Sequence, residues 1–229
     1  MVALVAQILT ENNILSHQNE GITIATVTNQ HQGITLAKEL LYAIVDKKTV
    51  LYLSGGSLKT LYMKLAQEEK IVPGAVGMID ERFGKKFHEN SNEKMSQETG
   101  FLRYLQMRDI PFYPILKSPR PPLRKGGAEG GGFLSRQAIA EAYDETFREL
   151  NATYPKSVGL LGIGPDGHTS SIIPNRPDFH NPWFDSAKQN LIESEFNDPN
   201  IHYNVRVGMT FLALSMLDVL IVLAFGENK

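Results

Sequence analysis

Short apolar runs alternate with segments of helical periodicity along most of this chain. Near-continuous apolar runs, each long enough for one strand, occupy residues 49–53, 75–79, 158–163 and 219–225. Runs of this kind are typical of parallel strands that are buried on both faces. A shorter β-rich run at 22–27 and a weaker one at 112–116 predict two further strands. We expect the strand at 219–225 to lie in the interior of the sheet.

Between these runs, apolar residues recur at spacings of three and four, which predicts amphipathic helices. The three clearest cases lie within residues 36–45, 58–65 and 138–147. Strands that alternate with helices predict an α/β fold. We therefore expect a single three-layer α/β/α domain over residues 1–229, with a mainly parallel, Rossmann-like doubly wound sheet. A length of 229 residues suits one such domain.

The predicted strand at 49–53 ends in the turn Ser54-Gly55-Gly56-Ser57, directly before a helical segment. Backbone N–H groups of a glycine-rich turn at a helix N-terminus favour an anion such as phosphate. The turn is not a P-loop, because the spacing and the Lys-Ser/Thr ending are absent. A tight strand-to-helix turn capped by Ser57 is the alternative interpretation.

The most informative stretch, residues 161–174, reads Leu-Gly-Ile-Gly-Pro-Asp-Gly-His-Thr-Ser-Ser-Ile-Ile-Pro. A buried strand breaks here into glycines and presents Asp166 and His168, while Thr169 or Ser170 could cap a short helix. Open α/β sheets build their sites at such strand ends. Histidine is also the side chain best suited to move protons near neutral pH. The alternative is an ordinary loop with an exposed histidine.

A third strand ends in the charged triplet Asp80-Glu81-Arg82. Three charges are unfavourable inside a core but could hold a ligand in a crevice beside the sheet. The arginine fork matches phosphate oxygens. A solvated surface turn is the alternative interpretation.

Taken together, these three strand ends resemble the 6-phosphogluconolactonase family. The resemblance rests on residues 54–57, 80–82 and 162–169 with Pro174, and extends to 87–92, 206–211 and 226–229. The Asp-Gly-His-Thr block is its most specific part. The Ser-Gly-Gly-Ser turn is shared with the related glucosamine-6-phosphate deaminases.

This resemblance implies hydrolysis of 6-phospho-D-glucono-1,5-lactone to 6-phospho-D-gluconate. Hydrolysis of a lactone needs a base to activate water and charge stabilisation for the intermediate, and it needs neither a metal nor another cofactor. We predict His168 as the general base. Asp166 would orient the imidazole or a substrate hydroxyl, or it could simply close the loop as an Asx-turn. Gly164 and Gly167 would supply backbone donors or clearance.

Phosphate binding would fall to the turn at residues 54–57 and to cationic side chains. Arg82 and Arg206 are candidate forks, and the resemblance adds Lys229, which follows Gly-Glu-x near the end of the chain. Asp80 would orient Arg82 or a sugar hydroxyl. A salt-bridged surface role is the alternative for Arg206.

Two other functions compete with the lactonase. A glucosamine-6-phosphate deaminase typically reads Asp-Glu-Tyr and Asp-Gly-His-Ile-Ala-Phe-Asn where this chain has residues 80–82 and 166–172, which favours the lactonase. A non-catalytic sugar-phosphate-binding protein is the third interpretation.

Composition excludes several classes of function. A net charge of −2 gives no electrostatic argument for nucleic acid or membrane binding, and the absence of cysteine excludes disulfides and thiol nucleophiles. Without a signal segment or an apolar run that could span a bilayer, a cytoplasmic location is expected. The sequence is silent on oligomeric state.

Two regions depart from the family's pattern. Residues 119–132 hold three prolines and five glycines and predict a tolerated surface insertion. The family continues by a further helix and strand after the position of Lys229. We therefore expect weaker substrate binding than in a longer family member, with a sheet edge or apolar face left uncovered.

Overall fold

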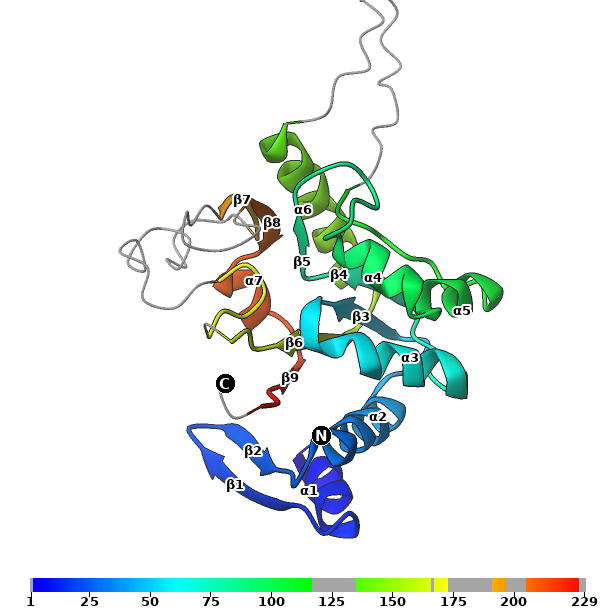
Figure 1. Cartoon of the computed structure of the whole chain (residues 1–229), viewed down its shortest axis with the longest axis vertical. Coiled ribbons are helices and arrows are strands. Elements are labelled where there is room, and N and C mark those ends of the chain that lie inside the picture. Colours follow the sequence, from blue (N-terminus) through cyan, green and yellow to red (C-terminus); the bar gives the residue numbers. More distant parts are fainter. Residues whose placement is uncertain (1, 117–134, 166, 173–190, 197–204, 227–229) are drawn as a thin grey trace, which may run out of the picture.

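The computed structural model describes residues 2–116, 135–165, 167–172, 191–196 and 205–226. At its centre, four parallel strands lie in the order β4-β3-β6-β9 (Figure 1). Their bounds are β3 Thr49–Leu53, β4 Ala75–Met78, β6 Lys156–Gly162 and β9 Val219–Leu223. The α/β fold with a parallel sheet flanked by helices is therefore confirmed. Both β3 and β4 are buried along their whole length, as their apolar runs predict.

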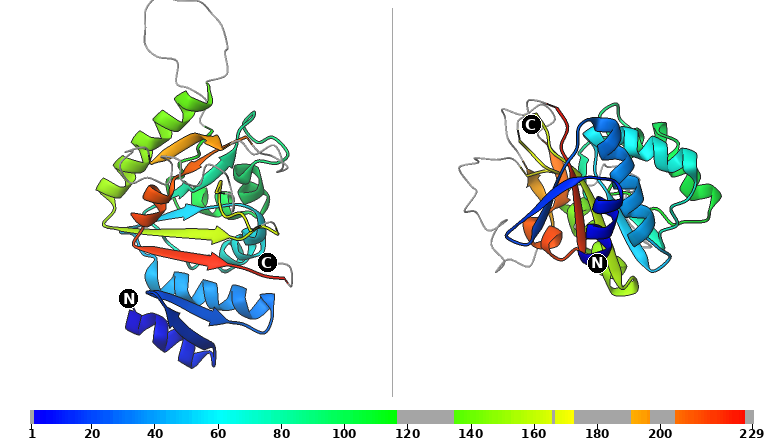
Figure 2. Two further views of the ribbon diagram at one scale, coloured as in Figure 1. Left: turned by 90° about the vertical axis from the view of Figure 1, so that its left-hand side faces the viewer. Right: turned by 90° about the horizontal axis from the view of Figure 1, so that it is seen from below.

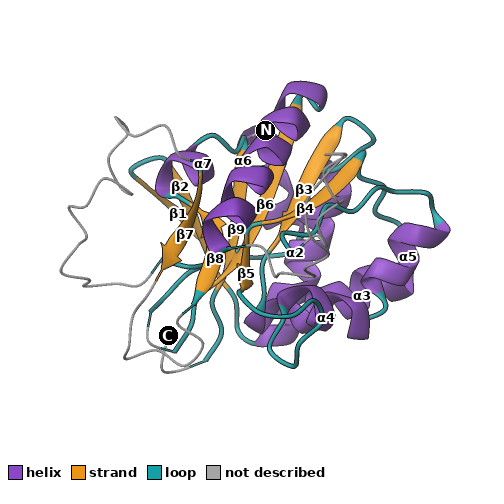
Figure 3. Cartoon of the chain, turned by 90° about the horizontal axis from the view of Figure 1, so that it is seen from above, coloured by secondary structure: helices purple, strands orange, loops and turns teal. Residues whose placement is uncertain are grey.

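Helices cover both faces of this sheet (Figure 3). One face packs against α2 (Gln30–Ile44) and α3 (Lys59–Glu68), and the other against α6 (Arg136–Thr153). The ring of Tyr52 on β3 packs at a tilt of 37° against the ring of Phe147 on α6, with centroids 5.3 Å apart. The predicted apolar face of α3 is confirmed, because Leu61, Tyr62 and Leu65 are fully buried.

A second, antiparallel sheet continues from the end of the parallel one, which the sequence pattern did not indicate. Only Ile79 separates β4 from β5 (Asp80–Arg82), and β5 pairs with β8 (Arg206–Met209). β8 in turn pairs with β7 (Ile192–Phe196). Ile79 joins the two sheets, since its N–H donates to Leu53 O (2.7 Å) and its carbonyl accepts from Met209 N (2.8 Å). Through this register Arg82 lies opposite Arg206.

The N-terminal region adds α1 (Val2–Glu11) and a hairpin of β1 (Leu15–Asn19) and β2 (Ile22–Thr26). The strand predicted at 22–27 is therefore present, but it belongs to a separate two-stranded antiparallel sheet. Figure 2 shows this region beyond the outer side of α2. A small cluster of Ile8, Leu9, Ile14 and Leu36 attaches it there.

Two strand predictions need correction. Residues 112–116 contribute only a single bridge, between Phe112 and Val76, so no strand forms there. β9 is an edge strand of the four-stranded sheet and not an interior one. Its Leu220 and Val222 are 40% and 46% exposed, and they line an apolar groove together with Phe211 and Leu214.

The remaining described elements are short. They are the 3-10 helix η1 (Gly56–Leu58) and the helices α4 (Asn92–Glu98), α5 (Phe101–Met107) and α7 (Phe211–Ser215). The predicted insertion at 119–132 and the predicted phosphate ligand Lys229 lie outside the described residues, and so does Asp166. No helix within the described ranges is long and apolar enough to cross a membrane.

Candidate active site

The glycine turn after β3 is held rigidly in place. The Tyr62 hydroxyl accepts from the N–H of Ser54 (3.1 Å) and donates to its carbonyl (2.8 Å). Gly56 has a φ of +66°, a conformation that side chains disfavour, and there the chain enters η1 and then α3. The turn therefore presents backbone N–H groups at the start of a helical segment, as the anion-binding prediction requires.

Two glycines in the site are dictated by close approach. A β-carbon at Gly55 would collide with the side-chain amide of Asn92, and one at Gly162 would collide with the hydroxyl of Ser57. In each case the glycine lies against a residue that is distant in sequence. The glycine turn therefore packs directly against both the start of α4 and the end of β6.

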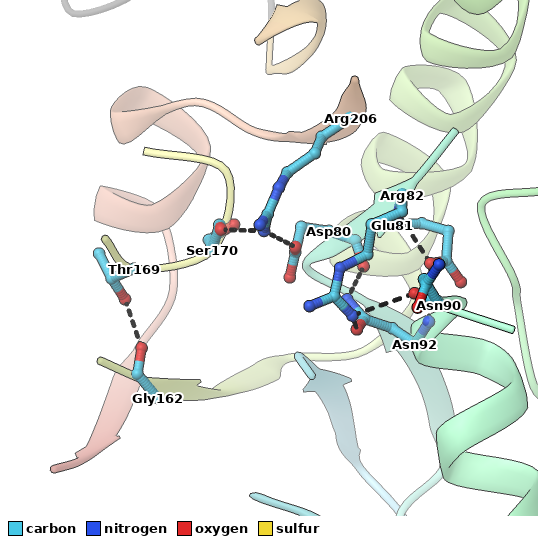
Figure 4. A network of polar contacts seen from close by, with 9 residues as sticks. All are labelled: Asp80, Glu81, Arg82, Asn90, Asn92, Gly162, Thr169, Ser170 and Arg206. Carbon is cyan, nitrogen blue, oxygen red and sulfur yellow. Dashed lines mark hydrogen bonds and ion pairs between the residues drawn. The ribbon is translucent and has the colours of Figure 1, made fainter. Parts of the chain in front are cut away.

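Arg82 carries a positive charge that no described carboxylate pairs with. One terminal nitrogen of its guanidinium donates to Asn90 O (3.3 Å) and to the side-chain oxygen of Asn92 (Figure 4). Its Nε is buried and has no hydrogen-bond partner among the described residues. Neutral acceptors thus fix the fork in place while its charge stays uncompensated, which suits an anionic ligand.

The position of Asn92 is set by Glu81. The buried Glu81 carboxylate accepts from the N–H groups of Arg82 (2.7 Å), Asn92 (2.7 Å) and Glu93 (2.9 Å), and from the Ser91 hydroxyl (2.9 Å). It therefore binds the otherwise unsatisfied donors at the start of α4. Burial raises the pKa of Glu81, and these hydrogen bonds oppose that rise. Asn92 Nδ2 also donates to Asp80 O (3.0 Å), which locks its amide.

Arg206 lies in a different environment. One of its nitrogens contacts Asp80 Oδ2 (3.3 Å) and donates to Ser170 O (2.9 Å), and all three residues are buried (Figure 4). Asp80 thus pairs with Arg206 and not with Arg82, which corrects that part of the prediction. The surface salt-bridge alternative for Arg206 is also wrong, because the side chain is only 5% exposed.

His168 lies at the end of a tight loop that follows β6. Gly164 N donates to His168 O (2.7 Å), Gly167 N donates to Gly164 O (3.0 Å), and the Thr169 hydroxyl donates to Gly162 O (3.0 Å). Both glycine N–H groups donate within the loop and are therefore not available as donors to a ligand. Of the two roles predicted for these glycines, only the provision of space for a ligand remains as a prediction. Thr169 closes this loop, and neither it nor Ser170 caps a helix in the described part of the chain.

These segments meet in one polar pocket of about 240 Å³ at the carboxyl end of the parallel strands. It brings together nearly all of the described residues that the sequence predicted. The lining comprises Ser54, Gly55, Gly56, Ser57, Asp80, Arg82, Asn92, Gly162, Ile163, Gly164, Pro165, His168, Ser170 and Arg206. Gly167 is the exception, since it lines a neighbouring apolar groove instead.

Sequence reasoning missed Asn92 and Ser170 as lining residues. Asn92 belongs to the segment 87–92 that carries part of the resemblance, but its sequence offers no sign that its amide reaches Gly55 and Arg82. Ser170 was considered only as a helix cap.

Within the segment 87–92, His88 donates from Nε2 to Arg82 O (2.9 Å) and accepts from Asn90 N at Nδ1 (3.3 Å). It therefore shapes the loop behind Arg82.

Among the described residues, no group of three or more His, Asp or Glu side chains could hold a metal ion. The fold and the pocket indicate the class of protein. This is an α/β protein with a polar pocket beside a glycine-rich turn and an arginine that no described carboxylate pairs with. Such a pocket suits a small anionic ligand.

The family follows from comparison with known proteins. Residues 28–229 match the model of the family described as glucosamine-6-phosphate isomerases/6-phosphogluconolactonase, so the chain belongs to this family. It is 30% identical over 141 residues to a probable chloroplastic 6-phosphogluconolactonase of Oryza sativa, and 30% identical over 114 residues to a 6-phosphogluconolactonase of Caulobacter vibrioides. These matches cover 55% and 48% of this chain, but only 39% and 49% of the relatives.

Solved structures agree with this assignment. A 6-phosphogluconolactonase from Leishmania guyanensis superposes with a TM-score of 0.64 at 25% identity, over 89% of this chain and 82% of that one. One from Thermotoga maritima gives 0.58 at 26% identity, over 86% and 79%. The family resemblance predicted from the sequence is confirmed.

Proposed function

We propose that this protein hydrolyses 6-phospho-D-glucono-1,5-lactone to 6-phospho-D-gluconate without a cofactor. The observation that carries the proposal is one pocket that His168 lines together with the glycine turn and Arg82. The family and the names of the relatives support the same substrate. A phosphorylated sugar lactone needs an anion site at one end of the pocket and a base at the other.

The phosphate would bind at the Arg82 end. No described carboxylate forms an ion pair with the Arg82 guanidinium, whereas Asp80 offsets the charge of Arg206. Backbone groups of Gly55, Gly56 and Ser57 lie in the same pocket. Each charge-assisted hydrogen bond to the phosphate would contribute about 1.5–3 kcal/mol. Lys229 stays a prediction as a further phosphate ligand.

At the other end, the His168 imidazole would take a proton from a water molecule as its oxygen attacks the lactone carbonyl. The tetrahedral intermediate then expels the ring oxygen, which would take the proton back from the His168 imidazolium as the ring opens. The carboxylic acid so formed loses its proton to water and gives the 6-phosphogluconate carboxylate. The loop bonds of Gly164 and Thr169 hold the backbone at His168 in one conformation, which limits reorganisation during the step. Asp166 stays a prediction as the group that orients the imidazole.

The test is an assay of the purified protein on freshly formed lactone, with 6-phosphogluconate measured above the spontaneous hydrolysis. We expect catalysed hydrolysis, and no release of ammonia from glucosamine 6-phosphate. Ammonia release without lactone hydrolysis would instead support the deaminase branch of the family. Tight binding of 6-phosphogluconate with neither reaction would support a non-catalytic sugar-phosphate-binding protein.

The cytoplasmic location stays a prediction from the sequence, and the rice relative is chloroplastic by name.

A further inference from the structure

The pocket also holds a group of buried polar residues that the phosphate and the proposed base leave unused. Arg206, Asp80 and Ser170 form this group, and each of them is at most 5% exposed. Asp80 pairs with Arg206, so their two charges offset each other. A buried ion pair of this kind suits an uncharged polar group of a ligand better than a second anion.

Two polar atoms of this group of residues have no hydrogen-bond partner among the described residues. They are Asp80 Oδ1, which can only accept while ionised, and the Ser170 hydroxyl, which can donate and accept. A buried polar atom without a partner costs about 1–3 kcal/mol. Structures retain such atoms where a ligand completes them.

Geometry places the two residues on either side of one nitrogen. The same Arg206 nitrogen contacts Asp80 Oδ2 at 3.3 Å and Ser170 O at 2.9 Å (Figure 4). The guanidinium thus fixes both residues relative to each other. An alcohol that reached both residues could donate to Asp80 Oδ1 and accept from the Ser170 hydroxyl, which would satisfy both atoms at once.

We propose that Ser170 is a specificity-determining residue which, with Asp80, recognises one hydroxyl of the sugar chain. The inference rests on the proposed function and deepens it, because it assigns one hydroxyl of the substrate to named residues. Sites built to hydrogen-bond a hydroxyl discriminate strongly against analogues that lack it.

The neighbouring residue offers a matched control. Ser171 is also buried, and its hydroxyl also has no described partner, but it does not line the pocket. Its hydroxyl points toward β8 instead, since a β-carbon at Gly208 would lie 2.6 Å from it. Ser170→Ala and Ser171→Ala therefore remove the same group from equally buried positions, and only the first removes it from the pocket.

The experiment is calorimetric titration of wild type and both variants with 6-phosphogluconate and with analogues that each lack one hydroxyl. We expect Ser170→Ala to weaken 6-phosphogluconate binding about 3- to 12-fold, the effect of one hydrogen bond. For one analogue, wild type and Ser170→Ala should bind equally well, because the hydroxyl that Ser170 recognises is already missing. Ser171→Ala should change no affinity. The melting temperature of ligand-free Ser170→Ala should not fall, because no described group depends on this hydroxyl.

A loss of the same size with every analogue, no loss at all, or an equal loss in Ser171→Ala would overturn the inference while leaving the proposed function intact. Conversely, wild type could fail to hydrolyse the lactone and yet show the Ser170 dependence with glucitol 6-phosphate. That result would overturn the proposed function and support the recognition of a hydroxyl. If wild type bound inorganic phosphate but neither sugar phosphate, both would be wrong.

Discussion

Arg82 and Arg206 lie opposite each other in the β5–β8 register, yet their surroundings divide their roles. Two neutral acceptors hold Arg82, and no described carboxylate pairs with its guanidinium. Arg206 faces a buried carboxylate at 3.3 Å. The sequence predicted both arginines as phosphate ligands, because their residue type alone cannot reveal which one has an acidic neighbour.

Replacement of Arg82 tests the phosphate assignment. We expect Arg82→Ala to weaken 6-phosphogluconate binding about 10- to 150-fold, while binding of unphosphorylated gluconate changes little. The free energy of unfolding should fall only slightly, because no described ion pair is lost. Arg103→Ala, a change of an exposed arginine on α5, is the control for general loss of charge. Equal losses for the two ligands would show that Arg82 does not bind the phosphate.

Replacement of Arg206 should act mainly on stability. Arg206→Met would leave Asp80 buried and unpaired, which typically costs about 3–5 kcal/mol in the free energy of unfolding. The double variant Asp80→Asn with Arg206→Met should recover much of that loss, because it removes the uncompensated charge. Urea denaturation of the wild type and of both variants measures this. If the double variant were as unstable as Arg206→Met, the pair would not be the cause.

At the level of elements, α4 begins where the Glu81 carboxylate gathers four donors. Glu81→Gln keeps the size of the side chain but turns one acceptor into a donor that faces N–H groups. We expect a loss of about 2–4 kcal/mol in stability. We also expect weaker phosphate binding, because Asn92 would no longer hold Arg82.

Glu93→Gln provides the matched control on the same helix. Glu93 is equally buried, but its carboxylate contacts only Lys86 at 3.3 Å among the described residues, and Oε2 has no partner. Its replacement should cost less than about 1 kcal/mol and leave ligand affinity unchanged. Similar effects of the two substitutions, measured by denaturation and calorimetry, would argue against Glu81 as the residue that positions α4.

The strands show most clearly how much of the fold the sequence pattern could predict. β3, β4 and β6 were predictable because strands buried on both faces are continuously apolar. β5 and β8 were not, since Asp80 and Arg206 interrupt the apolar pattern just where they pair with each other. Periodicity cannot detect a strand whose charged side chains are satisfied across the sheet. Asn92 and Ser170 could not be assigned to the pocket, because contacts with Gly55 and Arg206, which are distant in sequence, bring them there.

For the whole molecule, the described parts differ in how strongly they are packed. Residues of β3 are fully buried, whereas all five of β1 are exposed, and among the described strands β1 pairs with β2 alone. A two-stranded hairpin is marginally stable alone. We therefore expect backbone amides of β1 and β2 to exchange with deuterium long before those of β3 and β6. Equal protection in native-state exchange would mean that the hairpin unfolds only together with the parallel sheet.

His168 is the proposed general base, in a pocket built from segments that are far apart in the sequence. The most direct test of this role is hydrolysis of 6-phosphogluconolactone by wild type and by His168→Ala, with 6-phosphogluconate affinity measured on the same samples. We expect a loss of about 10²–10⁴-fold in the rate above background, with affinity and melting temperature nearly unchanged. Near-normal catalysis in a well-folded His168→Ala protein would contradict it.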